Sequence, residues 1–261
     1  MGLDVYAGPV SRYAGGDWQT VMQQSSVQTG VPVITVRSGA LPDDLLRAVA
    51  DMQAGLTGAR EVGPARAPVQ PIAQWQAEVK RRLGVDETWD DRPDGEFLSD
   101  QPGWWGYGAV LLLAAYDEQP ALAPGMKVKR LLGSRTVPAV APAEFGQAEA
   151  FQVAAQAPVR YPTLLRAEWC LPLEGGPVLF AAPTPFGKEV TMGHVSRLWA
   201  ELVMLNERTL RLDAEGLAKA RRNESEPDLN SFEAMAPFGL SVLLATAEFA
   251  VQRRAAWILD Y

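Results

Sequence analysis

The sequence has few of the residues that carry most metal, redox and acid–base chemistry: one cysteine, Cys170, and one histidine, His194. With a single cysteine the chain can form no intramolecular disulfide bond. A structural zinc site needs four cysteine or histidine ligands, so such a site is excluded. Cys170 lies in the apolar segment Glu168–Leu173, which favours a buried, inert thiol over a nucleophile.

The sequence also lacks the short motifs of common nucleotide-binding and hydrolase sites. Gly187-Lys188 is followed by Glu189 rather than Ser or Thr, and Ala182 stands where a phosphate-binding loop needs glycine. Gly106-Tyr107-Gly108 lacks the third glycine of a dinucleotide fingerprint. No Gly-x-Ser-x-Gly elbow occurs. We therefore expect neither a cofactor nor a metal ion, although the acids leave an all-carboxylate metal site open.

Basic residues are in deficit, with 24 lysines and arginines against 31 acids and a formal net charge of −7. Duplex recognition depends largely on neutralising phosphates with lysine and arginine, so this balance argues against nucleic-acid binding. The longest basic run is Lys80 to Arg82. The opening residues show no basic segment followed by a long apolar one, so we expect no signal peptide and a cytoplasmic protein.

The most apolar run, Trp104 to Tyr116, carries no charge. It is shorter than the roughly 20 residues that span a bilayer, so we expect no membrane contact and a central buried helix near 104–116. With 261 residues, 48% of them hydrophobic, the chain can bury a sizeable core. We predict one globular domain, residues 1–261, of α/β or α+β class, with a mixed sheet and about six helices.

Hydrophobic periodicity and turn residues place the other elements. The first fifty residues read as strand, helix, strand and helix, at 3–7, 17–28, 31–37 and 42–52. Further helices are predicted at 72–83, 144–156, 195–212 and 237–254. Further strands are predicted as a pair within 126–140, a hairpin of 164–173 with 178–182, and single strands at 188–192 and 257–259.

Residues 85–100 form an acidic loop with seven acids against one arginine. A calcium-binding loop is excluded, because Arg92 and Gln101 occupy two ligand positions. One interpretation is a solvated loop whose charges repel one another. The other is a docking surface for a basic partner, with two aromatic anchors among the acids. Its candidate partner-binding residues are Trp89, Asp90, Asp91, Asp94 and Phe97.

A polar and aromatic cluster occupies residues 4–18, and its members are Asp4, Tyr6, Arg12, Tyr13, Asp17 and Trp18. A half-buried carboxylate in an apolar strand needs a partner, and Arg12 is the candidate for Asp4. The two residues form either a structural ion pair or the polar floor of a ligand pocket walled by the aromatic residues. Trp104 and Trp105 either line that pocket or pack in the core.

His194 stands at the start of the helix predicted at 195–212. One interpretation gives it a packing or capping role at this helix start. The other makes it a catalytic or ligand-binding group, which would require an acid or a nucleophile nearby in space.

The opening segment, Met-Gly-Leu-Asp-Val-Tyr-Ala-Gly-Pro-Val-Ser-Arg-Tyr followed by Gly-Asp-Trp, resembles the start of a group of uncharacterised bacterial proteins of similar length. The apolar helix that leads into Asp260-Tyr261 is similar to that group as well. The group has no assigned activity, so the resemblance implies only a bacterial, cytoplasmic placement.

These observations leave three functions open. The leading hypothesis is a non-catalytic binding or interaction protein, immunity-like or regulatory, with a protein partner at the acidic loop. The alternative is a carboxylate-dependent hydrolase or transferase with a pocket near Asp4, Arg12 and His194. The third is a small-ligand sensor that uses the tryptophans and tyrosines without chemistry. The oligomeric state stays open.

Overall fold

The computed structural model describes residues 3–21, 24, 68–87, 89, 91–130, 133–222 and 231–261. The strand predicted at 31–37, the helix predicted at 42–52 and Asp90 lie outside these residues. In the helix predicted at 17–28, residues 17–20 are not helical, and most of the remainder lies outside the described residues.

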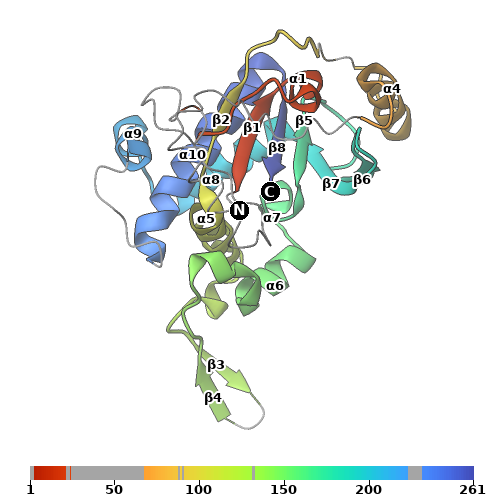
Figure 1. The fold of residues 1–261 in the computed structure, drawn as a ribbon. Helices are drawn as coiled ribbons and strands as arrows, with labels where there is room; N and C mark the ends of the chain where they lie inside the picture. The colour runs from red at the N-terminus through yellow and green to blue at the C-terminus, as the bar shows by residue number, and fades with distance from the viewer. Residues whose placement is uncertain are drawn as a thin grey trace, which may run out of the picture.

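A mixed six-stranded sheet forms the centre of the fold, in the order β2-β1-β8-β5-β7-β6 (Figure 1). Its strands are β1 (Asp4–Gly8), β2 (Leu98–Asp100), β5 (Trp169–Leu171), β6 (Phe180–Pro183), β7 (Glu189–His194) and β8 (Ala256–Asp260). Strands β5 and β7 pair in parallel, and the other neighbours in this sheet pair antiparallel. The predicted α/β or α+β class is confirmed.

A separate two-stranded hairpin projects away from the rest of the fold (Figure 1). Its strands are β3 (Lys127–Arg130) and β4 (Gly133–Thr136), which pair antiparallel. The strand pair predicted within 126–140 is therefore confirmed.

Helices cover both faces of the large sheet. They are α1 (Val10–Gly15), α4 (Ile72–Leu83), α5 (Gly103–Glu118), α6 (Glu149–Gln156), α7 (Pro162–Arg166), α8 (Val195–Arg208), α9 (Ala214–Arg222) and α10 (Phe232–Arg253). Two 3-10 turns, η1 (Pro120–Leu122) and η2 (Pro142–Gln147), flank the small hairpin in sequence. The helix predicted at 72–83 is confirmed, and Gly84 ends it in the left-handed conformation at φ 65°. The short helices α1, α7 and α9 were not predicted.

The sheet separates two hydrophobic cores, because successive side chains of a strand point to opposite faces. Val5 of β1 and Leu259 of β8 belong to the core that contains α5 and α10. Tyr6, Ile258 and Trp169 belong to the other core, which is completed by α1 and α4. The two cores therefore share the central strands, and each lies under a different set of helices.

The predicted central helix is confirmed as α5, which is buried continuously from Gly106 to Ala115. It packs against α10, which begins at Phe232 rather than at the predicted Pro237. Ser231 caps α10, accepting a hydrogen bond from the backbone N–H of Ala234 at 3.2 Å. By length and composition α10 could cross a membrane, but 61% of its apolar window is buried in the fold, which is consistent with a soluble protein.

The predicted hairpin of 164–173 with 178–182 is wrong. The start of its first strand lies in α7, which runs from Pro162 to Arg166, and only Trp169–Leu171 remains as β5. Strand β7 lies between β5 and β6, so these two strands never pair. The apolar run at Leu164 and Leu165 fits a buried helix as well as a strand, and the tertiary contacts of α7 decide between them.

The helix predicted at 195–212 ends earlier, at Arg208. The Asn206 side chain terminates it, donating to the carbonyl of Leu212 at 2.8 Å and accepting from its N–H at 3.0 Å. Arg211 adopts a positive φ of 53° in the turn between them. This local hydrogen bonding competes with helix continuation, and α9 follows as a separate element.

Candidate functional site

The aromatic members of the predicted N-terminal cluster do come together. Tyr6 and Tyr13 have ring centroids 5.3 Å apart, and Trp18 lies 5.2 Å from Tyr6 and 5.6 Å from Tyr13. Tyr6 is fully buried and its hydroxyl donates to the carbonyl of Pro9 at 2.8 Å. These rings therefore pack chiefly against one another in the core beneath α1.

Asp4 and Arg12 do not form the predicted pair. Arg12 donates to the carbonyl oxygens of Asp17 at 2.7 Å and Gly95 at 2.8 Å, and its guanidinium lies 4.4 Å from the centre of the Phe97 ring. The Arg12 guanidinium is engaged by these backbone carbonyls and this ring, so it does not pair with Asp4. The charged neighbours of Asp4 are other carboxylates.

Asp4 is instead surrounded by negative charge. Its Cα pairs with that of Asp260 across the β1–β8 ladder, and Asp100 lies on the neighbouring β2. Burial, together with the charges of Asp260 and Asp100, raises the pKa of Asp4 to about 6. Its Oδ1 is buried and accepts no hydrogen bond from the described residues.

His194 is buried at the end of β7, immediately before α8, where it occupies the N-cap position but forms no capping hydrogen bond with its side chain. Its Nδ1 lies 2.8 Å from the carbonyl oxygen of Leu173, and its Nε2 lies 2.8 Å from that of Pro177. Because a carbonyl oxygen only accepts, a ring nitrogen must donate. The ring thus holds the Leu173–Pro177 segment against the sheet.

Asp4 and His194 lie far apart in the sheet, on the separate strands β1 and β7. Strands β8 and β5 lie between β1 and β7, so the two residues are about 14 Å apart in the direction across the strands. The register aligns His194 with Leu171, towards the Gly8 end of β1, which adds about 13 Å along the strands. The two side chains therefore share no pocket.

Large side chains of the acidic loop point into the protein rather than outward. Trp89 is buried, with its ring centroid 6.1 Å from that of Trp75, and Phe97 stacks on Tyr6 at 5.9 Å. Asp91 accepts hydrogen bonds from the N–H groups of Val10 and Ser11 at the start of α1, the latter at 2.9 Å. Three of the predicted partner-binding residues thus hold the loop in place.

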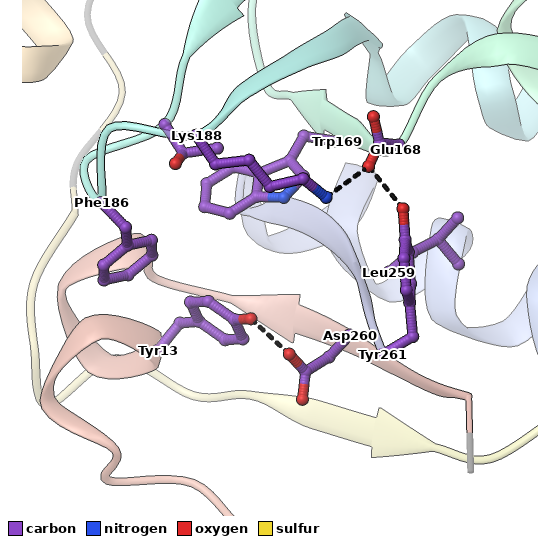
Figure 2. A pocket seen from close by; sticks show the side chains of 9 residues that line it. Tyr13, Glu168, Trp169, Phe186, Lys188, Leu259, Asp260 and Tyr261 are labelled. Atoms are coloured by element: carbon purple, nitrogen blue, oxygen red, sulfur yellow. Dashed lines mark hydrogen bonds and ion pairs between the residues drawn. The ribbon is translucent and has the colours of Figure 1, made fainter. Parts of the chain in front are cut away.

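A small pocket opens beside these elements on the same side of the sheet, where the turn between β6 and β7 approaches β8 (Figure 2). Its volume is about 40 Å³. It is lined by Tyr13, Glu168, Trp169, Thr184, Phe186, Lys188, Leu259, Asp260 and Tyr261. Tyr13 alone comes from the predicted cluster. Trp104 instead contacts Tyr261, with ring centroids 5.5 Å apart.

Two hydrogen-bonded groups form the polar part of the pocket (Figure 2). Glu168 accepts from the Lys188 ammonium at 2.9 Å and from the Tyr261 hydroxyl at 2.5 Å. Burial acts to raise the pKa of Glu168, but these two donors outweigh it and hold the pKa below its usual value. On the other side, the Tyr13 hydroxyl donates to Asp260 Oδ1 at 2.6 Å.

Two polar side chains of the pocket have unused hydrogen-bonding capacity. Asp260 forms no ion pair with any cation in the described part of the chain. Thr184 is 2% exposed, and its hydroxyl has no hydrogen-bond partner among the described residues. Across all described residues, no group of three or more His, Cys, Asp or Glu side chains is arranged to hold a metal ion.

Sequence reasoning missed most of this pocket because its residues come from four separate segments. Glu168 and Trp169 precede or begin β5, Lys188 precedes β7, and Asp260 ends β8. No short motif links them, and only the strand order brings them together. The available signal for this pocket in the sequence was Asp260, an acid at the end of the strand predicted at 257–259.

Comparisons with protein-family models, curated proteins and solved structures found no match to this chain.

Proposed function

We propose that this chain is a non-catalytic interaction protein of the bacterial cytoplasm, immunity-like or regulatory, that docks a basic partner protein through its acidic loop. The observation that carries the proposal is the way the loop is held. Trp89 is buried in the core and Phe97 packs partly buried against it, while several acids of the loop face solvent.

Three contacts anchor the loop from inside. Trp89 packs in the core beside Trp75, Phe97 lies between Tyr6 and the Arg12 guanidinium, and Asp91 caps α1. A surface that is already ordered loses little conformational freedom when a partner binds. The anchors predicted for a partner therefore serve the protein itself, and they hold the described residues of the loop in place.

The exposed acids give the loop its charge. Asp86, Asp94 and Glu96 are exposed, and Glu96 reaches Arg253 at 2.8 Å. Both side chains of that pair are more than half exposed, so the ion pair contributes little and leaves the carboxylate available to a partner. Exposed charges of one sign speed the association with a basic surface and make it sensitive to salt.

The geometry gives less support to the enzyme hypothesis. Its catalytic groups, Asp4 and His194, lie far apart in the sheet, and both ring nitrogens of His194 lie 2.8 Å from backbone carbonyl oxygens. The pocket of about 40 Å³ is also far below the roughly 300–1,000 Å³ of typical small-molecule sites. A surface that binds another protein is therefore the better candidate for the functional site.

The test compares two triple variants of the full chain that change the net charge equally. The loop variant carries Asp86→Asn, Asp94→Asn and Glu96→Gln. The control variant carries Glu207→Gln, Glu215→Gln and Glu248→Gln, three exposed acids on α8, α9 and α10. Asp91 is left intact because its replacement would remove the cap of α1.

Each protein is used to capture partners from a bacterial lysate, and captured partners are then measured by titration at several salt concentrations. We expect a basic partner that binds the wild type and the control variant alike. The loop variant should bind it at least tenfold more weakly, with a shallower salt dependence. Equal binding by both variants, or the absence of any partner, would overturn the proposal.

A further inference from the structure

We propose that the pocket between Tyr13, Phe186 and Asp260 is a binding site for a guanidinium or ammonium group, the end of an arginine or lysine side chain or of a small amine. The site is separate from the acidic loop, and its ligand is defined by three features: aromatic walls, an uncompensated carboxylate and a buried hydroxyl that can accept a hydrogen bond.

Aromatic rings form the walls. The ring centroids of Tyr13 and Trp169 are 5.8 Å apart, those of Tyr13 and Phe186 are 5.9 Å apart, and those of Trp169 and Phe186 are 6.4 Å apart. The faces of such rings are electron-rich and attract cations. One cation already uses this property, since the Lys188 ammonium lies 5.0 Å from the centre of the Tyr261 ring.

The charge of the pocket favours a positive ligand. Lys188 neutralises Glu168, but Asp260 has only the neutral hydroxyl of Tyr13 as a side-chain partner in the described part of the chain. Asp4 is paired with Asp260 in the β1–β8 ladder and adds a second carboxyl group at this corner. A cation beside Asp260 would offset the negative charges of Asp260 and Asp4. An anion would be repelled by both carboxylates, and Lys188 would not neutralise it because Lys188 already pairs with Glu168.

Thr184 supplies a further acceptor. Its hydroxyl is buried without a partner, although a buried polar group is normally hydrogen-bonded. The backbone around it is fixed, with the Thr184 N–H donating to the Lys188 carbonyl at 2.7 Å and the Gly187 N–H donating to the Thr184 carbonyl at 2.9 Å. Thr184 therefore stays at the pocket wall, and because its hydroxyl oxygen is shielded from solvent, a ligand N–H can donate to it only after the side chain turns towards the pocket.

The size of the pocket limits the ligand. A bound water needs roughly 10–15 Å³ in this measure, so about 40 Å³ accepts about three or four non-hydrogen atoms. That number matches a guanidinium group or the last atoms of an alkylammonium. It excludes a nucleotide or a sugar.

The test titrates the full-length protein with N-acetyl-arginine amide and with N-acetyl-citrulline amide, its neutral counterpart of nearly the same shape, called arginine amide and citrulline amide below, and follows binding by NMR chemical-shift changes and calorimetry. A pentapeptide with one central arginine forms a third arm. We expect arginine amide to bind and citrulline amide not to bind. Binding of the peptide would identify a protein side chain as the ligand, whereas binding of arginine amide alone would identify a free small cation.

Matched variants locate the binding. Asp260→Asn keeps the shape and the Tyr13 hydrogen bond but removes the charge, and it should weaken arginine amide binding at least tenfold. Thr184→Val removes only the hydroxyl and should weaken binding severalfold. The exposed acid change Glu207→Gln is the control for charge and should leave binding unaltered.

Three results would overturn the proposal: no saturable binding of arginine amide, equal binding of citrulline amide, or equal affinity in Asp260→Asn. The probe needs no partner protein, so the outcome is independent of the acidic-loop proposal. The loop variant described above should bind arginine amide as the wild type does.

Discussion

Gly239 on α10 faces Gly106 on α5 so closely that a Cβ atom on Gly239 would lie 2.1 Å from the Gly106 carbonyl oxygen. Two buried helices cross here with backbone against backbone. No side chain larger than hydrogen fits at this point, so the crossing fixes how the two central helices of this core meet.

Replacing Gly239 with alanine should therefore destabilise the protein by about 2 kcal/mol or more, because the helices must separate to admit the methyl group. The matched control is Gly15→Ala in α1, where a Cβ would have no neighbour within 4 Å. That change should be neutral or slightly stabilising. Urea denaturation of both variants measures the difference, and equal stabilities would contradict this view of the crossing.

Asp4 should make stability fall as the pH rises from about 4 to about 6. Its pKa of about 6 in the folded protein exceeds the ordinary 3.8, so the folded state holds the proton more tightly in this range. The stabilisation from the protonated Asp4 carboxyl is fully present below pH 4 and is lost as the carboxyl ionises. Above pH 6 the contribution of Asp4 does not change further. Asp4→Asn should remove this slope and raise the free energy of unfolding at neutral pH by about 2 kcal/mol.

Denaturation curves at several pH values check this expectation, with the exposed Asp94→Asn as the control for charge. An unchanged slope in Asp4→Asn would mean that folding does not raise the pKa of this carboxyl.

Glu201 extends the same behaviour to higher pH. This buried residue of α8 accepts hydrogen bonds from the N–H groups of Thr163 at 3.1 Å and Leu164 at 2.7 Å, at the start of α7. Burial raises its pKa to about 7, against the lowering effect of these donors. Stability should thus fall further between about pH 4.5 and 7. Asp4 does not explain a decrease in stability above pH 6, and Glu201→Gln should flatten this decrease.

Glu201→Ala should cost about 2–3 kcal/mol near pH 4, where Glu201 is protonated, since two buried N–H groups would lose their acceptors. Glu201→Gln keeps one acceptor oxygen and should cost less. Thermal or chemical unfolding separates the two variants, and a larger loss for Gln than for Ala would rule out this capping role.

Asp91 and Asp94 should behave differently although they are near neighbours in one acidic loop. Asp91→Ala removes the acceptor for the Val10 and Ser11 N–H groups and should destabilise the protein by about 1 kcal/mol. Asp94→Ala changes an exposed side chain and should stay within about 0.5 kcal/mol of the wild type. The midpoints of chemical denaturation give both values, and similar losses would show that Asp91 is no cap.

Local sequence signals predicted much of the secondary structure. The uncharged run of α5 and the periodic face of α4 each depend on residues close in the chain, so periodicity was sufficient to place them. The position of β7 between β5 and β6 depends on long-range pairing, and the local turn residues at Gly175 and Gly176 suggested a hairpin that does not form. Strand order is a tertiary property, and the sequence pattern carries little information about it.

The candidate site was harder to predict for the same reason. Tyr6, Tyr13 and Trp18 lie close in sequence and do meet. Asp4 lost its predicted partner because the sheet brings Asp260 and Asp100 beside it. The neighbour of a charged residue can be predicted from sequence only when it lies close in the chain. The neighbours of Asp4 lie on other strands.

The position of β8 in the middle of the sheet has a kinetic consequence. It pairs with β1 on one side and β5 on the other, and it follows all the other strands in the chain. Until it is in place, the β2-β1 pair and the β5-β7-β6 group have no backbone connection within the sheet. During synthesis both groups must wait for β8 with unpaired edges, and such edges favour aggregation. Closing a ladder between residues as distant as Asp4 and Asp260 should also make folding slow, because a long loop must be ordered before the pairing stabilises it.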